Sequence, residues 1–195
     1  GSGGHDVAEG GIEGTGRVAT NDASVGTITG FGSVFVNGVE YETDKANVEI
    51  DDNANATEDD LEIGMIVTIQ GNVNQDGVTG DALSIQYSED IRGYVEAIDV
   101  NAGKLVVVGQ EVLTDELTEY DNTTLESLMV GDFVEVSGIT GGSMLLATRI
   151  EKETVEANAE IKVKGDVTNL DAISQTFSLG HLTINYGTAE LDVDD

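Results

Sequence analysis

The stretch of the chain most similar to a ligand-binding motif is DDNANATEDDLE. Oxygen-bearing side chains fall at its positions 1, 3, 5, 7, 9 and 12, the spacing of the calcium loop in a helix-loop-helix hand. They are Asp51, Asn53, Asn55, Thr57, Asp59 and Glu62. However, Ala56 takes the place where that loop needs glycine, and Thr57 with Asp60 also fits a helix cap. We therefore favour a solvated acidic loop here, with calcium as the alternative and the only cofactor considered.

Residues suited to catalysis are scarce. A nucleophilic mechanism needs a base beside the nucleophile, and the only histidines are His5 and His181. His5 lies in a glycine-rich start, and His181 falls at an expected hairpin turn. Acidic residues are so dense that two neighbouring carboxylates do not identify an acid-base pair. GGIEGTG lacks the lysine of a phosphate-binding loop. We expect no catalytic residues and no enzyme.

Charge narrows the range of partners. The chain has 38 acidic and 8 basic residues and a formal net charge of −30. Such a surface repels nucleic acid and anionic lipid, and it suits a medium rich in salt or calcium. No window reaches the ~18 apolar residues of a membrane span. We expect neither nucleic-acid binding nor an integral membrane segment, and the absence of cysteine excludes disulfides.

The element that must position any site is an internal repeat. LEIGMIVTIQG, which ends at Gly71, returns as LMVGDFVEVSG, which ends at Gly138, at a constant offset of 67 residues. Alternating apolar and polar residues, 25 glycines and no proline favour short strands joined by tight turns. Asn37-Gly38 is suited to a hairpin turn. The sequence predicts an all-β protein.

Each copy contains three strands, a short helix and two more strands. The helix of the first copy carries Leu61 behind the Thr57 cap, and that of the second copy covers 123–128. This order is typical of the OB fold, a small five-stranded Greek-key barrel, and a split antiparallel sandwich is the alternative. The few aromatic residues mostly alternate inward, so we assign them to the core. Sugar binding by one or two exposed tyrosines stays open.

A third copy begins near Gly165. GDVTNLD aligns with GYVEAID at an offset of 72, and AELDVDD, at 189–195, aligns with ANVEIDD at an offset of 143. It contains three strands and lacks the helix and the last two strands. The expected divisions are a glycine-rich arm at 1–25, a barrel at 26–91, a second at 92–155 and a partial repeat at 160–195. The start without methionine suggests a processed product.

The residues GFGSVFVNGVEY and the paired LxxGxxVxxxG stretches resemble an uncharacterised domain family that is repeated in bacterial exported proteins and predicted lipoproteins. The resemblance covers about 26–195. It implies an exported, envelope-associated location, and it brings no activity and no site residues. The glycine-rich start is similar to the segment that follows a lipid-modified cysteine in such proteins, although this chain has no cysteine.

Together these features predict a non-enzymatic, exported structural or interaction protein of the bacterial cell surface. An incomplete barrel leaves a sheet edge and an apolar face unpaired, which invites a strand from elsewhere. Later residues of a longer parent protein or a neighbouring subunit could supply that strand. We expect self-association through the third repeat and the arm at 1–25, joining subunits head to tail into a filament. The alternative is an envelope module that binds glycan or calcium on an OB-like barrel.

Overall fold

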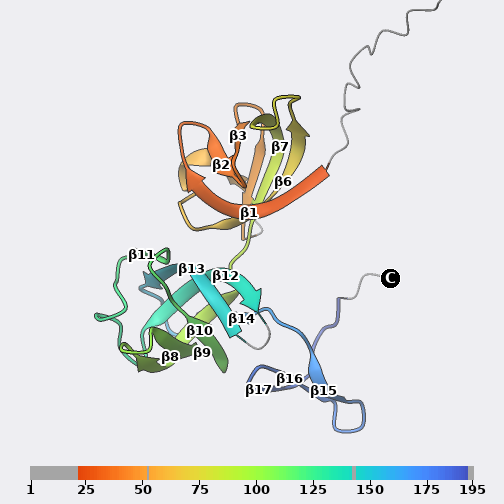
Figure 1. Cartoon of the computed structure of the whole chain (residues 1–195). Helices are drawn as coiled ribbons and strands as arrows, with labels where there is room; N and C mark the ends of the chain where they lie inside the picture. The colour runs from red at the N-terminus through yellow and green to blue at the C-terminus, as the bar shows by residue number, and fades with distance from the viewer. Residues whose placement is uncertain (1–21, 52, 142–143, 193–195) are drawn as a thin grey trace, which may run out of the picture.

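A computed structural model describes residues 22–51, 53–141 and 144–192. These residues form two barrels in tandem and a small third sheet (Figure 1). The prediction of an all-β chain with two complete modules and one partial module is confirmed. His5 and most of the arm predicted at 1–25 lie outside the described residues. None of the described residues belongs to a helix with the length and apolar character needed to cross a bilayer.

The first barrel closes through five strands. β1 pairs with β2 on one side and with β6 on the other, and β3 closes the barrel by running parallel to β7. This pairing is that of an OB-like barrel, which confirms the predicted fold class. The strands are β1 (Asp22–Gly30), β2 (Val34–Val36), β3 (Val39–Glu42), β6 (Ile66–Val73) and β7 (Thr79–Tyr87).

The alternation in the sequence sets the barrel interior. Along β6, Val67 and Ile69 are fully buried while the residues between and beside them are more exposed, and they pack against Ile28 and Ile85. The predicted hairpin joins β2 to β3 at Asn37, whose φ of 54° is the left-handed conformation that such turns need. One apolar face per strand therefore fills this barrel.

The connection between the third and fourth barrel strands contains more strand and less helix than predicted. It forms β4 (Asn47–Ile50), which runs parallel to β7, then β5 (Asn53–Ala56), then a single 3-10 turn, η1 (Glu58–Asp60). The predicted cap is present, because the Thr57 amide donates to Asp60 Oδ2 at 2.8 Å. The short helix is thus reduced to one turn, and β5 was not expected.

The second barrel repeats the closure of the first. β8 pairs with β9 and β12, and β10 runs parallel to β13. β11 runs along β13 as β4 runs along β7, and β14 adds to β8. The strands are β8 (Ile91–Asp99), β9 (Lys104–Val107), β10 (Gln110–Leu113), β11 (Glu119–Asp121), β12 (Phe133–Gly141), β13 (Met144–Glu153) and β14 (Lys162–Val163).

The helix predicted at 123–128 is wrong. This segment contains only turns. Thr124 and Ser127 form the reciprocal bonds of a capping box, because Ser127 Oγ accepts from the Thr124 amide at 2.8 Å and Thr124 Oγ1 accepts from the Ser127 amide at 3.2 Å. Only one turn follows, because the Gly131 amide already donates to the Val95 carbonyl at 2.8 Å as the chain enters β12. Leu125 and Leu128 are nevertheless buried against the second barrel.

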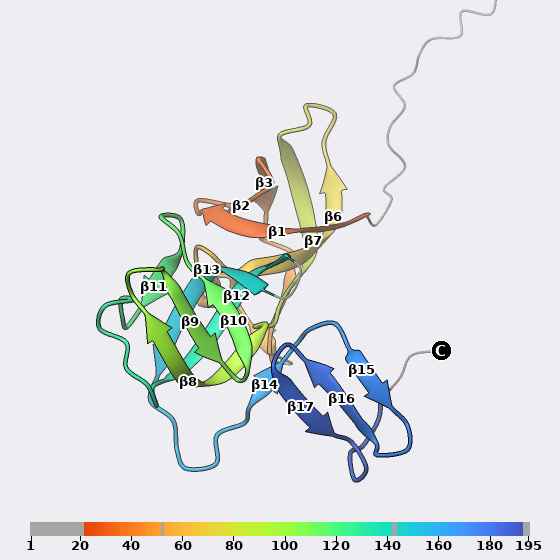
Figure 2. The same cartoon turned by 60° about the horizontal axis from the view of Figure 1, so that its bottom comes forward.

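The third module is an antiparallel sheet of β15 (Thr168–Asp171), β16 (Thr176–Leu179) and β17 (Leu182–Asn185), placed beside the second barrel (Figure 2). Its β16–β17 hairpin repeats the β9–β10 register. Phe177 faces Ile184 as Leu105 faces Val112 in the second barrel. The third module therefore corresponds to strands one to three of a barrel.

The strand expected from the alternation after Ala189 is absent from the part described. Ala189 to Asp192 lie outside any strand, and the remaining residues of that segment are not described. The aligned residues of the first copy form β4, which pairs with the fifth barrel strand, β7. No fifth strand is present in the third module as described, so the segment has no edge to pair with.

Candidate functional site

The acidic stretch that suggested a calcium loop folds as a hairpin instead. Asn53 and Asn55 lie exposed on β5, Thr57 caps η1, and Asp59 is exposed in that turn. Glu62 pairs with Arg149 of the second barrel at 3.0 Å. The structure thus does not reproduce the helix-loop-helix geometry behind the prediction. Only Asp51 of the predicted set joins a cluster of acids.

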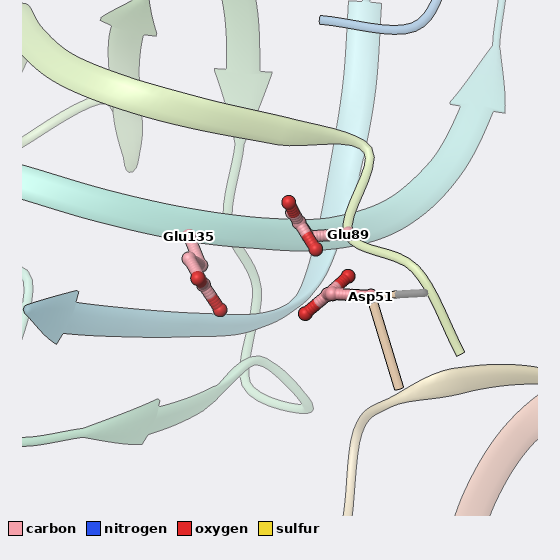
Figure 3. Close-up of side chains that lie close together, drawn as sticks. All are labelled: Asp51, Glu89 and Glu135. Atoms are coloured by element: carbon pink, nitrogen blue, oxygen red, sulfur yellow. The ribbon is translucent and has the colours of Figure 1, made fainter. Parts of the chain in front are cut away.

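That cluster lies between the two barrels. Oxygen atoms of Asp51, Glu89 and Glu135 all lie within 4.8 Å of one another, and the three carboxylates converge (Figure 3). Asp51 is in the turn after β4, Glu89 in the short connection from β7 to β8, and Glu135 on β12. The Asp51 amide donates to the Tyr87 carbonyl at 3.0 Å, which fixes the turn beside this connection. Three separate segments therefore build the cluster.

The cluster is buried and incompletely paired. Glu89 is 2% exposed and Glu135 is 9% exposed. Oε2 of Glu89 and Oδ1 of Asp51 are buried and accept no hydrogen bond. Buried carboxylate oxygens normally have a partner, because loss of water is otherwise uncompensated. Both oxygens therefore require a proton or a cation.

Two basic side chains reach the cluster without neutralising it. The Lys162 ammonium lies 3.5 Å from Glu89 Oε1 and 3.9 Å from Asp51 Oδ1. Arg92 pairs with Glu135 at 2.7 Å and with a fourth carboxylate, Glu153, at 2.9 Å. With all groups ionised, four carboxylates and two cations leave a formal charge of −2.

Burial, and after it the surplus negative charge, raises the pKa of two of the carboxyl groups. Burial, followed by the neighbouring Glu89, raises the pKa of Asp51 to about 7. Burial, followed by contact with Glu153, raises the pKa of Glu135 to about 8. Burial also opposes ionisation of Glu89, but hydrogen bonding to Asp51 and to its own backbone, with the charge of Lys162, lowers its pKa overall. Below about pH 7, and with no cation bound, a proton thus resides on Asp51 rather than on Glu89.

Direct contacts around the cluster hold the barrels together. The Thr148 hydroxyl donates to the Gly64 carbonyl at 2.7 Å across the junction. Arg149, which is 5% exposed, pairs with Asp121 of its own barrel and with Glu62 of the first. Asp90 Oδ2 accepts from the Gly138 amide at 3.0 Å, which ties the connecting segment to β12. The cluster therefore lies in a packed junction.

A second feature with functional potential is the apolar face of the third sheet. Val167 is 55% exposed, although its counterpart Val95 in the second barrel is 1% exposed. Phe177 and Ile184 are only half-buried, whereas their counterparts Leu105 and Val112 are in the core. Strands four and five cover these positions in the barrels. The described third sheet leaves them open to solvent.

The third sheet is nevertheless held in place. The His181 amide donates to the Gly109 carbonyl at 2.9 Å, and Gln110 Nε2 donates to the Leu179 carbonyl at 2.7 Å. His181 lies at the turn between β16 and β17, as predicted, with a side chain 73% exposed and 3.9 Å from Glu111. The hairpin turn of the third module thus rests on the hairpin turn of the second.

The tyrosines do not share one surface. Tyr41 and Tyr87 are buried in the first barrel, and Tyr94 packs edge-on against Phe133 in the second. Tyr186 stacks on Phe177 in the third module. No stacking platform with several exposed tyrosines is formed by the described residues.

Comparison with known families gives one match. A family model described as Domain of unknown function (DUF5666) matches residues 16–86 and residues 92–151. The two matches coincide with the first and second barrels. Neither the curated proteins nor the solved structures contain a significant match.

Proposed function

This chain belongs to the DUF5666 family, and from that premise and its open third sheet we propose that it is a non-enzymatic interaction protein that assembles by strand addition. A second copy of the chain supplies the missing strands. Subunits then join head to tail into a filament at the bacterial surface. The exposed apolar face of the third sheet is the observation that carries this proposal.

The outer strands of the third sheet support it. β15 and β17 each have one neighbour among the described strands, so their outer edges offer backbone groups for pairing. In the second barrel the corresponding edges are covered by β12 and β13. Two antiparallel strands with one apolar face would complete the third module in the same way.

A second copy is the occupant that the repeat favours. The β16–β17 hairpin has the register of β9–β10, so the third sheet is shaped for strands with the alternation found in this chain. The donor we propose is the part of the arm that precedes β1, residues 1–21 of the next subunit, which carries Val7, Ile12 and Val18. Donor and acceptor surfaces then differ, and such contacts build open filaments unless the rotation closes a ring.

The proposed location rests on charge and resemblance. The excess of 38 acidic over 8 basic residues suits an environment where salt or calcium screens self-repulsion. The GFGSVFVNGVEY resemblance points to exported proteins. Protease treatment of intact cells of the source bacterium, compared with lysed cells, tests this: degradation only after lysis would contradict a surface location.

Light scattering after size exclusion, with electron microscopy, tests assembly. Leu170, 65% exposed on β15, is the position to change, and Leu117, 82% exposed on the second barrel, is the control. Leu170→Lys should shift oligomers to monomer, whereas Leu117→Lys should not. Deletion of 1–21 should also give monomers. A strictly monomeric parent chain at high concentration, without fibres, would contradict the proposal.

A further inference from the structure

We propose that the junction between the two barrels binds one divalent cation of the calcium class through Asp51, Glu89 and Glu135. This inference does not depend on filament assembly. It concerns how the first and second barrels are locked together, and it assigns a ligand to a site made by residues distant in sequence.

The spacing of the carboxylates fits calcium. Calcium binds oxygen at about 2.3–2.6 Å, so ligands on opposite sides of the ion lie up to about 5 Å apart. The oxygens of the three side chains lie within 4.8 Å of one another. Magnesium binds oxygen at about 2.0–2.1 Å and demands a tighter octahedron. A calcium-sized ion can therefore contact all three with small adjustments.

The orphaned oxygens point independently to a ligand. Glu89 is only 2% exposed, yet its Oε2 accepts no hydrogen bond. Oδ1 of Asp51 is also buried and accepts no hydrogen bond. A cation between them would satisfy both when Asp51 is ionised. Without a cation, a proton on Asp51 that is hydrogen-bonded to Glu89 takes this place, because Lys162 lies 3.9 Å from Asp51 Oδ1, beyond hydrogen-bond distance. The Asp51 side chain is 31% exposed, which leaves a side from which water can complete the coordination shell.

The charge balance agrees with a divalent ion. When all four are ionised, which a bound cation favours, Asp51, Glu89, Glu135 and Glu153 carry four negative charges, and Lys162 and Arg92 carry two positive charges. The remaining −2 equals the charge that one divalent cation neutralises. Asp90 and Lys164 lie next to this cluster and carry opposite charges, so they do not alter the sum.

The site differs from the diffuse acidity of the surface. The chain has 38 acidic residues, but among those described only these three converge as a group. Asp51 belongs to the first barrel, Glu135 to the second and Glu89 to the connection. An ion bound here would stabilise the arrangement of the two barrels, because it binds the folded junction and not the separated segments.

Calorimetric titration of chelator-treated protein with calcium chloride, in about 0.15 M salt to screen diffuse binding, tests the proposal. We expect one saturable site per chain. Glu89→Gln and Glu135→Gln preserve shape and remove charge, and each should weaken binding at least about ten-fold. Asp59→Asn is the matched control, because it removes an exposed carboxylate from the stretch suggested by sequence.

Terbium luminescence gives a second readout. The Tyr87 hydroxyl neighbours the site, because it contacts Ser137 Oγ at 2.7 Å and, after burial, the charges of Glu135, Asp51 and Glu89 all raise its pKa. The chain has no tryptophan to compete as donor. Excitation of tyrosine should sensitise a bound terbium ion, and calcium should displace it. Circular dichroism and the melting temperature without metal show whether each variant folds.

Three results would overturn the site: no saturable calcium heat, unchanged affinity in a folded Glu89→Gln variant, or loss of binding in Asp59→Asn. Loss of binding in Asp59→Asn would place the calcium ion at the exposed β4–β5 hairpin instead. One site per chain, lost in both glutamate variants and kept in the control, would establish it.

Discussion

The Tyr87 hydroxyl of the first barrel lies 2.7 Å from Ser137 Oγ of the second, and both side chains are buried. This contact joins the end of β7 to the middle of β12, beside the acidic cluster. Because water cannot reach this junction, removal of one hydroxyl leaves the other buried without a hydrogen-bond partner.

Tyr87→Phe is therefore expected to lower the free energy of unfolding by about 1–3 kcal/mol. Chemical denaturation measures it. Ser137→Ala and the double variant complete a cycle in which the two single losses should not add, because the second change removes an oxygen that is already unpaired. Simple additivity would show that the two hydroxyls do not interact in solution.

Gly64 and Gly131 are equivalent in the repeat and offer a matched pair of substitutions. Both have positive φ, 90° and 94°. A Cβ at Gly64 would lie 2.7 Å from the Thr148 carbonyl, whereas one at Gly131 would meet nothing within 4 Å. Gly131→Ala should cost about 1–2 kcal/mol from backbone strain alone.

Gly64→Ala should cost about 1–3 kcal/mol more than Gly131→Ala, because it also forces the barrels apart. Thermal unfolding of both variants measures the difference. Equal losses would mean that the close approach at Gly64 does not contribute to stability.

The acidic junction predicts a pH dependence in the absence of divalent cations. The pKa values of Asp51 and Glu135 rise to about 7 and about 8 in the folded protein, from ordinary values of 3.8 and 4.5. The folded state then holds protons that the unfolded chain releases, so stability should fall as pH rises from about 4 to about 8. Glu89 has a lowered pKa, so its own contribution to stability changes only at pH values below this range.

Melting temperatures recorded from about pH 5 to pH 8.5 in chelator test this prediction. General repulsion on a chain with a net charge of −30 would also lower stability as pH rises, so the measurement is made in high salt, which screens that repulsion. Glu135→Gln should flatten the profile, and saturating calcium should do the same to the parent chain, because the ion replaces the protons. A profile unchanged by Glu135→Gln would remove the junction as its cause.

Completing the third module should change its behaviour. A copy of residues 124–155, added after Asp195, continues the 72-residue offset and supplies the counterparts of β12 and β13 in register with the repeat. We expect the extended chain to be monomeric and Val167 to become buried, with amides at 165–185 exchanging more slowly. An extension with Val134, Val136 and Ile150 of the copy changed to serine should not have this effect.

The barrels were predictable because their information is local. Alternation in segments such as Val67 and Ile69, the turn residues Asn37-Gly38 and the offset between copies suffice to place strands and their order. The helices were overestimated for a local reason as well. Thr124 and Ser127 form a capping box that is typical of a helix start, but only one turn follows before the chain pairs with β8 and enters β12.

The acidic junction was not predictable in the same way. Asp51 stood out within a regular spacing of oxygens, yet its partners Glu89 and Glu135 are distant in sequence and surrounded by many other acids. Only closure of both barrels and the short connection between them bring the three together. Residues that meet only when two modules fold and pack together do not recur at a regular spacing along the sequence, so no sequence pattern identifies them.

The two junctions between successive modules use different surfaces. The first barrel meets the second through the Gly64 loop and Thr148, whereas the third sheet meets the second turn to turn at Gly109 and His181. A solenoid requires one constant screw operation between neighbours. These modules therefore do not form a regular superhelix within one chain, and any long-range periodicity in a fibre must come from contacts between whole molecules.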